Sequence, residues 1–225
     1  MKIGDTYWLT ILIEIQIAFI LIAVIAFIRV PKLGRKDYLG LGLMMCANLL
    51  TEIITFIGYE GFHRNMNLVV SIFNLIYLPC GLWFYQRRIE GLSKTIVMSL
   101  SLIFVTIGLA NLFFYQGIHG FNSYTSTLVQ IGFMCLSTAY FAALFFQLSV
   151  NHTVRGMFWI NTAVLIYSSG TFFIHLLINY LVKFLNNDLI LVLMIHHTLG
   201  LVYFGLIIYG LNKVRREYLS HIISI

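Results

Sequence analysis

Ionisable side chains lie inside long apolar stretches of this sequence, where they could take part in chemistry. They are Glu14, Glu52, His175 and the neighbouring pair His196 and His197. An ionisable group at the centre of a membrane helix costs about 2.5–3.5 kcal/mol unless it is paired, so such residues mark candidate functional sites. A carboxylate beside an imidazole can change its charge near neutral pH, bind a polar molecule or carry a proton.

These groups are expected at one common depth in a membrane. Each of the two acids, and likewise His175 and His196, lies about two helical turns from the same side, which corresponds to about 10–12 Å. Amide and hydroxyl side chains accompany them at similar depth or on the same helix faces, namely Asn48, Asn74, Gln130, Asn161 and Tyr203. The sequence therefore predicts a ligand or proton pocket in one half of a helix bundle.

Asn161 is included in this predicted pocket because it belongs to a polar stripe on one helix. Along the stretch 156–182, polar residues recur at offsets close to whole helical turns, at Asn161, Ser168, His175 and Asn179. Residues at such offsets share one face of a helix. We expect this face to point into the bundle.

Three interpretations of the polar layer are open. The groups could hydrogen-bond one another and hold the bundle together, each contributing about 0.6–2 kcal/mol. They could form a ligand or proton site. They could also hold a metal, with zinc as a possible cofactor, because two imidazoles and a carboxylate match its ligands. The metal candidates are Glu52, His175 and His196, but no H-x-x-x-H or H-E-x-x-H spacing is present.

The elements that must position these residues are membrane-spanning helices. The chain is 60% hydrophobic and 10% charged, which leaves too little polar surface for a soluble domain. Backbone polar groups cannot stay unpaired in lipid, so continuous apolar stretches of about 20 residues form helices. Seven stretches qualify: 7–29, 38–59, 66–86, 94–115, 124–150, 156–182 and 189–212. The sequence predicts an all-α integral membrane protein, a single seven-transmembrane-helix bundle over residues 1–225.

The net charge of +6 is unevenly distributed over the connections between these stretches. Basic residues gather in alternate connections and after the last stretch: Arg29, Lys32, Arg35, Lys36, Arg87, Arg88, Lys94, Arg155, Lys213, Arg215 and Arg216. The other connections hold few, such as Arg64 and Lys183. Positive residues favour the cytoplasmic side, so we expect the N-terminus outside and the C-terminus in the cytoplasm. The basic clusters would meet anionic lipid headgroups of the bilayer, and no nucleic-acid partner is expected.

Several short motifs carry a family resemblance. They are FWINTA (158–163), LIYSSG (165–170), NY (179–180), LTEII (50–54), IH (195–196) and VY (202–203). With these motifs the chain resembles a family of small seven-helix integral membrane proteins common in Bacteroidota. The resemblance implies a multi-pass protein of a bacterial inner membrane, with Glu52, Asn161 and His196 in the shared pattern. Members often carry an acid where this sequence has Tyr77, so no site that uses that acid is expected here. The resemblance implies no particular activity.

The residues favour a function without fixing one. The leading hypothesis is a non-enzymatic membrane sensor or signalling component, whose outward-facing intramembrane pocket binds a small ligand or protons and shifts helix packing. A membrane or cytoplasmic protein partner would read the change. One alternative is a metal-dependent intramembrane lipid hydrolase, and another is a proton-coupled small-molecule transporter with Glu52 and His196 as the relay. No retinal is expected, because Lys213 lies at the end of the last stretch rather than in its middle.

Overall fold

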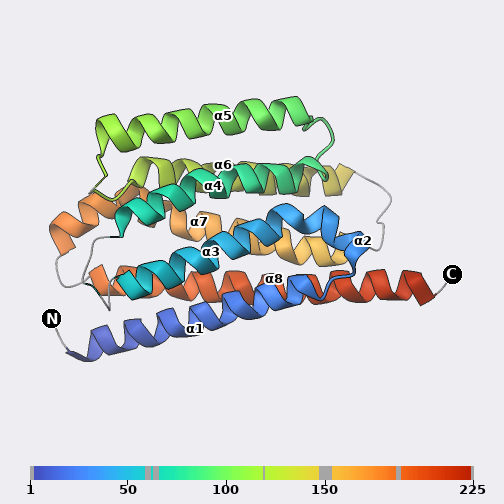
Figure 1. The fold of residues 1–225 in the computed structure, drawn as a ribbon, viewed down its shortest axis with the longest axis horizontal. Coiled ribbons are helices and arrows are strands. Elements are labelled where there is room, and N and C mark those ends of the chain that lie inside the picture. Colours follow the sequence, from blue (N-terminus) through green and yellow to red (C-terminus); the bar gives the residue numbers. More distant parts are fainter. Residues whose placement is uncertain are drawn as a thin grey trace.

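The chain folds into a bundle of long helices (Figure 1). The computed structural model describes residues 3–58, 62, 66–118, 120–146, 154–185 and 189–223. Within these ranges, seven helices are long and apolar enough to cross a membrane. This finding confirms the all-helical class and the number of predicted spans, and it indicates a multi-pass membrane protein. Arg64, which entered the charge argument, lies outside the described residues.

The helices follow the apolar stretches closely. The long ones are α1 (Ile3–Ile28), α3 (Leu39–Phe56), α4 (Asn67–Gln86), α5 (Lys94–Ala110), α6 (Ser123–Phe146), α7 (Val154–Leu185) and α8 (Leu189–Ile223). Short turns extend some of them: α2 (Lys32–Arg35), the 3-10 turn η1 (Lys36–Tyr38) and the π-helical turn η3 (Asn111–Tyr115). The predicted end at residue 212 was too early for the last helix. Lys213 and the two arginines after it end the apolar run, but lysine and arginine are good helix formers and the helix continues.

Six of the long helices close into a ring. α1 packs on α3, α3 on α4, α4 on α6, α6 on α7, α7 on α8, and α8 returns to α1. α5 packs on α4 and lies at the edge of the bundle, outside this ring (Figure 1). The chain begins and ends at opposite ends of the bundle, which we call the N-terminal end and the C-terminal end. A ring of helices has an interior in which an enclosed site can form.

The helices α7 and α8 approach each other closely at two glycines. A Cβ atom added to Gly210 would lie 2.8 Å from the carbonyl oxygen of Gly156 and 2.7 Å from Cγ1 of Ile160. Small residues at helix crossings allow backbones to come this close. The carbonyl oxygen belongs to the backbone, so it cannot swing aside to admit a methyl group.

The variant Gly210→Ala is therefore expected to lower the free energy of unfolding by about 1–2 kcal/mol, because the added methyl group forces the two helices apart. Thermal unfolding of the detergent-purified protein measures the effect. Gly205→Ala on the same helix is the control, since its Cβ would meet Cε1 of Phe19 at an ordinary 3.8 Å. Equal destabilisation by both substitutions would contradict this account of the crossing.

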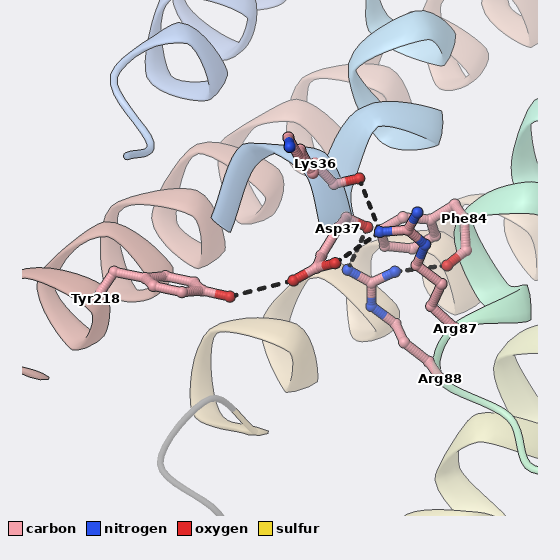
Figure 2. A network of polar contacts seen from close by, with 6 residues as sticks. All are labelled: Lys36, Asp37, Phe84, Arg87, Arg88 and Tyr218. Atoms are coloured by element: carbon pink, nitrogen blue, oxygen red, sulfur yellow. Dashed lines mark hydrogen bonds and ion pairs between the residues drawn. The ribbon is translucent and has the colours of Figure 1, made fainter. Parts of the chain in front are cut away.

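At the C-terminal end of the bundle, Asp37 of η1 joins two other elements (Figure 2). Its Oδ1 atom accepts a hydrogen bond from Nη1 of Arg87 at 2.7 Å, directly after α4. Its Oδ2 atom accepts from the hydroxyl of Tyr218 in α8 at 3.4 Å. Arg87 also donates to the backbone oxygen of Lys36 at 3.3 Å. We call the residues drawn in Figure 2 the Asp37 cluster.

Arg88 is the most enclosed cation of this cluster by its contacts. Its guanidinium donates to the backbone oxygens of Phe84 and Asp37 at 2.5 and 2.9 Å. The same group lies 4.4 Å from the ring centroid of Tyr38 and 4.1 Å from that of Phe84. Arg88 thus connects η1, which leads directly into α3, with the end of α4 through hydrogen bonds and cation–π contacts.

Candidate functional site

A cavity of about 250 Å³ lies inside the ring, between α3, α4, α6, α7 and α8. Its polar wall consists of Asn48, Thr51, Glu52, Thr55, Asn74, Gln130, His175, His196 and His197. Its apolar and aromatic wall consists of Val70, Phe73, Tyr77, Phe121, Tyr167, Ile174, Ile178 and Leu193. A cavity that is largely apolar with a few converging polar groups is the usual form of a small-molecule site.

The polar wall forms one layer near the N-terminal end of the bundle. Asn74, Gln130 and His196 each lie about two turns after the start of their helices, at the N-terminal end. Glu52 lies about one turn before α3 ends at the same level. On α3 the neighbouring Leu50 is 60% exposed, so the apolar face points outward and the polar face points into the ring.

Gln16 of α1 connects two residues of this wall. Its Nε2 atom donates to Oε1 of Glu52 at 3.2 Å, and its Oε1 atom lies 2.8 Å from Nδ1 of His197. Because an amide oxygen can only accept, Nδ1 of His197 must be the donor, which places the proton of a neutral His197 on Nδ1. Gln16 is itself buried, with 3% of its surface exposed. The three side chains form a directed chain of hydrogen bonds that ends on the carboxyl group of Glu52.

The other two imidazoles have hydrogen-bonding capacity that is not used. Nδ1 of His175 and Nδ1 of His196 are buried and have no hydrogen-bond partner among the described residues. The two rings meet edge to face, with centroids 5.5 Å apart, and His175 also stacks on Phe121 at 6.0 Å. A buried polar atom left unpaired costs about 1–3 kcal/mol. A structural polar core would normally satisfy such atoms, and their presence beside a cavity is typical of a binding site.

Tyrosines separate the cavity from the rest of the ring interior. Tyr77 and Tyr167 line the cavity, and Tyr203 lies behind them, with its hydroxyl 2.9 Å from the Tyr77 hydroxyl. The rings of Tyr167 and Tyr203 are 4.9 Å apart. Further along the ring interior, Phe204 and Ile207 are almost fully buried. The cavity is therefore closed towards the C-terminal end.

Six of the predicted pocket residues line the cavity: Asn48, Glu52, Asn74, Gln130, His175 and His196. Asn74 is already engaged, because its Nδ2 atom donates to Oγ of Ser126 at 2.7 Å. These six side chains thus lie around one cavity. Their role as a ligand or proton pocket stays a prediction.

The structure does not bring Glu14 into the cavity. Glu14 lies on the exposed face of α1, whereas Gln16 is buried. Successive residues of a helix are rotated by about 100°, so positions two apart point in nearly opposite directions. The depth of Glu14 matched the layer, but its direction did not.

Asn161 and Tyr203 also lie outside the cavity wall. Asn161 is fourteen positions before His175, which places it about 21 Å along α7 from that residue. There its Oδ1 atom accepts from the Tyr85 hydroxyl at 2.6 Å and its Nδ2 atom donates to the Ser137 backbone oxygen at 3.1 Å. Of the predicted stripe on α7, Asn161 and Ser168 are buried and His175 lines the cavity, whereas Asn179 is exposed and donates to Oγ of Ser123 at 2.9 Å.

The metal interpretation finds no ligand set. Among the described residues, no group of three His, Cys, Asp or Glu side chains is arranged to hold a metal ion. Glu52, His175 and His196 therefore share one cavity without forming a tetrahedral site. The geometry of the described residues gives no support for zinc as a cofactor.

Comparison of the chain with known protein families, with curated proteins and with solved structures found no match. The functional argument therefore depends on the geometry of the cavity.

Two polar residues of the site were left out of the predicted pocket. Gln16 is the one amide in its apolar stretch, at the same depth as the other polar groups, and that signal was present. His197 was named among the intramembrane ionisable groups but not among the pocket residues, because on a helix it points about 100° away from His196. The packing of α1 against α8 explains why His197 still contributes, since it turns toward Gln16.

Proposed function

We propose that this protein is a membrane receptor that binds a small polar ligand in the cavity and transmits the binding through its helices. One observation carries the proposal. Glu52, His175 and His196 converge on a cavity inside the ring, and two of them have buried nitrogen atoms without partners among the described residues. A ligand that satisfies these groups would favour the helix arrangement in which they converge.

The proposal includes an orientation. The described basic residues of the connections Arg29–Lys36 and Arg87–Lys94, with Lys213–Arg216, lie at the C-terminal end of the bundle. By the positive-inside rule this end is cytoplasmic and the N-terminal end is outside. The ligand would then come from outside the cell and reach a cavity in the outer half of the membrane. The Bacteroidota resemblance supports a bacterial inner membrane as the location.

A route from the cavity to the cytoplasmic end runs through three helices. α3, α4 and α8 carry Glu52, Asn74 and His196 at the cavity. The same three helices begin or end in the Asp37 cluster, through Asp37, Arg87 and Tyr218 (Figure 2). A shift of these helices on binding would change the Asp37 cluster, where a membrane or cytoplasmic protein partner could read it.

The two alternative functions have less support from the geometry. A lipid hydrolase of the metal-dependent kind needs a ligand set that the described residues do not form. A proton-coupled transporter needs a path to the opposite side of the membrane, and the tyrosine layer with Phe204 and Ile207 closes the ring below the cavity.

The proposal is tested by thermal unfolding of the purified protein against a library of small polar metabolites. A ligand that binds the folded state raises the unfolding midpoint in proportion to its concentration relative to Kd. We expect at least one chemical class to do so, and we expect Glu52→Gln to abolish its effect. Glu14→Gln is the matched control, an acid at similar depth on the outer face of α1. A stabilising effect that is equal in wild type and Glu52→Gln would contradict the site.

A second measurement separates binding from a structural role. If His196 serves a ligand, its unpaired nitrogen is a cost in the free protein, so His196→Leu should leave the unfolding midpoint unchanged or raise it. If His196 holds the bundle together, the same substitution should lower the free energy of unfolding by about 1 kcal/mol or more. The second result would overturn the receptor proposal.

A further inference from the structure

The charge of the cavity wall is unbalanced. Among the described residues, Glu52 carries the one carboxylate of the wall, and the seventeen lining residues include neither lysine nor arginine. In the same part of the chain no lysine or arginine forms an ion pair with Glu52, which accepts a hydrogen bond from the neutral amide of Gln16. A carboxylate in a site of low dielectric is stabilised best by a positive charge placed beside it. The described residues do not supply that charge, so a ligand could.

The aromatic part of the wall favours the same kind of ligand. Phe73, Tyr77, Phe121 and Tyr167 line the cavity from α4, from the segment before α6 and from α7. Phe73 and Tyr77 form a tilted pair with centroids 4.7 Å apart. The face of an aromatic ring attracts ammonium groups, most strongly where water is excluded. A carboxylate among aromatic rings is the arrangement that recognises organic cations.

The three imidazoles do not give the cavity a preference for anions instead of cations. The ring centroids of His175 and His196 are 5.5 Å apart, and those of His196 and His197 are 5.4 Å apart. At such distances a second positive charge is strongly opposed by the first. We therefore do not expect the three rings to carry positive charges together, whereas a neutral imidazole can accept a hydrogen bond from an ammonium group.

The size of the cavity limits the ligand. An apolar cavity of about 150 Å³ holds a benzene molecule, so the cavity of about 250 Å³ has room for a ligand on the order of ten non-hydrogen atoms. The side chains of Asn48, Thr51 and Gln130 offer hydrogen bonds to a polar group elsewhere on such a molecule.

From this combination we infer that the cavity binds a small organic cation, an amine with an apolar or aromatic body, with Glu52 as its counter-charge. The inference rests on the proposed receptor function and narrows its ligand. It concerns the charge of the ligand, which the receptor proposal leaves open.

Three probes that share one ring and differ in charge test the inference: benzylamine, benzyl alcohol and benzoate. Each is titrated into the purified protein in a non-ionic detergent, and binding is measured by calorimetry and by the shift in unfolding midpoint. We expect benzylamine to bind at least tenfold more tightly than either of the others. Glu52→Gln should weaken benzylamine binding at least tenfold, since it keeps the shape of the side chain and removes its charge. Glu14→Gln should leave the affinity unchanged.

The wild-type comparison decides the cationic preference even if a variant fails to fold. If benzyl alcohol or benzoate binds to the wild type as tightly as benzylamine, the cationic preference is wrong. The receptor proposal then stands where cavity variants such as Glu52→Gln alter that binding. If benzylamine binds equally to wild type and Glu52→Gln, the assignment of Glu52 as counter-charge is wrong. If neither these probes nor any metabolite class of the library binds, both the inference and the receptor proposal are wrong.

Discussion

The variant Arg88→Ala is expected to lose about 3 kcal/mol of unfolding free energy, seen as a large fall in the thermal midpoint. The substitution removes two hydrogen bonds from a charged donor, to the backbone oxygens of Phe84 and Asp37. A hydrogen bond from a charged group contributes about 1.5–3 kcal/mol when its partner is left without another hydrogen bond. It also removes the guanidinium that packs against the rings of Tyr38 and Phe84. Tyr38 is buried, so its ring would be left beside an empty space.

The neighbouring Arg87 provides the control. Arg87 forms the ion pair with Asp37, but the two side chains are 49% and 46% exposed. Exposed ion pairs contribute at most about 1 kcal/mol, so Arg87→Ala should shift the midpoint little. Arg88→Lys should fall between the two, because it keeps the charge and loses the planar group that bonds two oxygens at once. If Arg87→Ala were as destabilising as Arg88→Ala, the ion pair rather than the enclosed guanidinium would hold this end of the bundle.

The membrane class and the number of spans could be predicted from the sequence because they depend on length and hydrophobicity alone. An apolar stretch of about 20 residues has few structures available in lipid, so each such stretch by itself predicts a membrane-spanning helix. The end of α8 shows where this argument stops. Lys213, Arg215 and Arg216 mark the end of the apolar run, but they do not break a helix that continues to Ile223.

The depth of the candidate site could also be predicted from the sequence. Which residues belong to the site could be predicted only in part. Depth follows from position along each helix, and the three residues that it grouped, Glu52, His175 and His196, line one cavity. Direction follows from the rotation of each helix in the bundle, which one sequence does not contain. That is why Glu14 was placed in the pocket and Gln16, two positions later, was not.

The order of the helices around the ring was out of reach of the sequence for a related reason. The exclusion of α5 from the ring depends on which faces pack together, and every span is apolar enough to face lipid. In a membrane the hydrophobic effect does not distinguish a helix–helix contact from a helix–lipid contact. Close packing at residues such as Gly156 and Gly210 and buried polar pairs such as Tyr85 and Asn161 decide the arrangement instead.

A double-mutant cycle between Gly200 and Gln16 should show the largest coupling of any pair in the site. A Cβ atom added to Gly200 would lie 2.8 Å from Oε1, 2.9 Å from Cδ and 3.1 Å from Nε2 of Gln16. These amide atoms form both the bond to Glu52 and the bond to His197. The methyl group of Gly200→Ala must therefore displace the amide and break both bonds, at an expected cost of about 2–3 kcal/mol of unfolding free energy.

In the Gln16→Ala background, Gly200→Ala should hardly change the free energy of unfolding. The amide is gone, the methyl group enters the space that it leaves, and alanine gains up to about 1 kcal/mol over glycine in a helix interior. Unfolding of the four proteins should give a coupling free energy of about 2 kcal/mol, well above the about 0.5 kcal/mol seen between independent sites. Gly170→Ala is the control, because its Cβ would meet the mobile end of Leu199, 2.8 Å away, rather than Gln16. Its effect should add to that of Gln16→Ala. If Gly200→Ala were additive as well, Gln16 would not be held between α3 and α8, and the chain of hydrogen bonds to Glu52 would have to be abandoned.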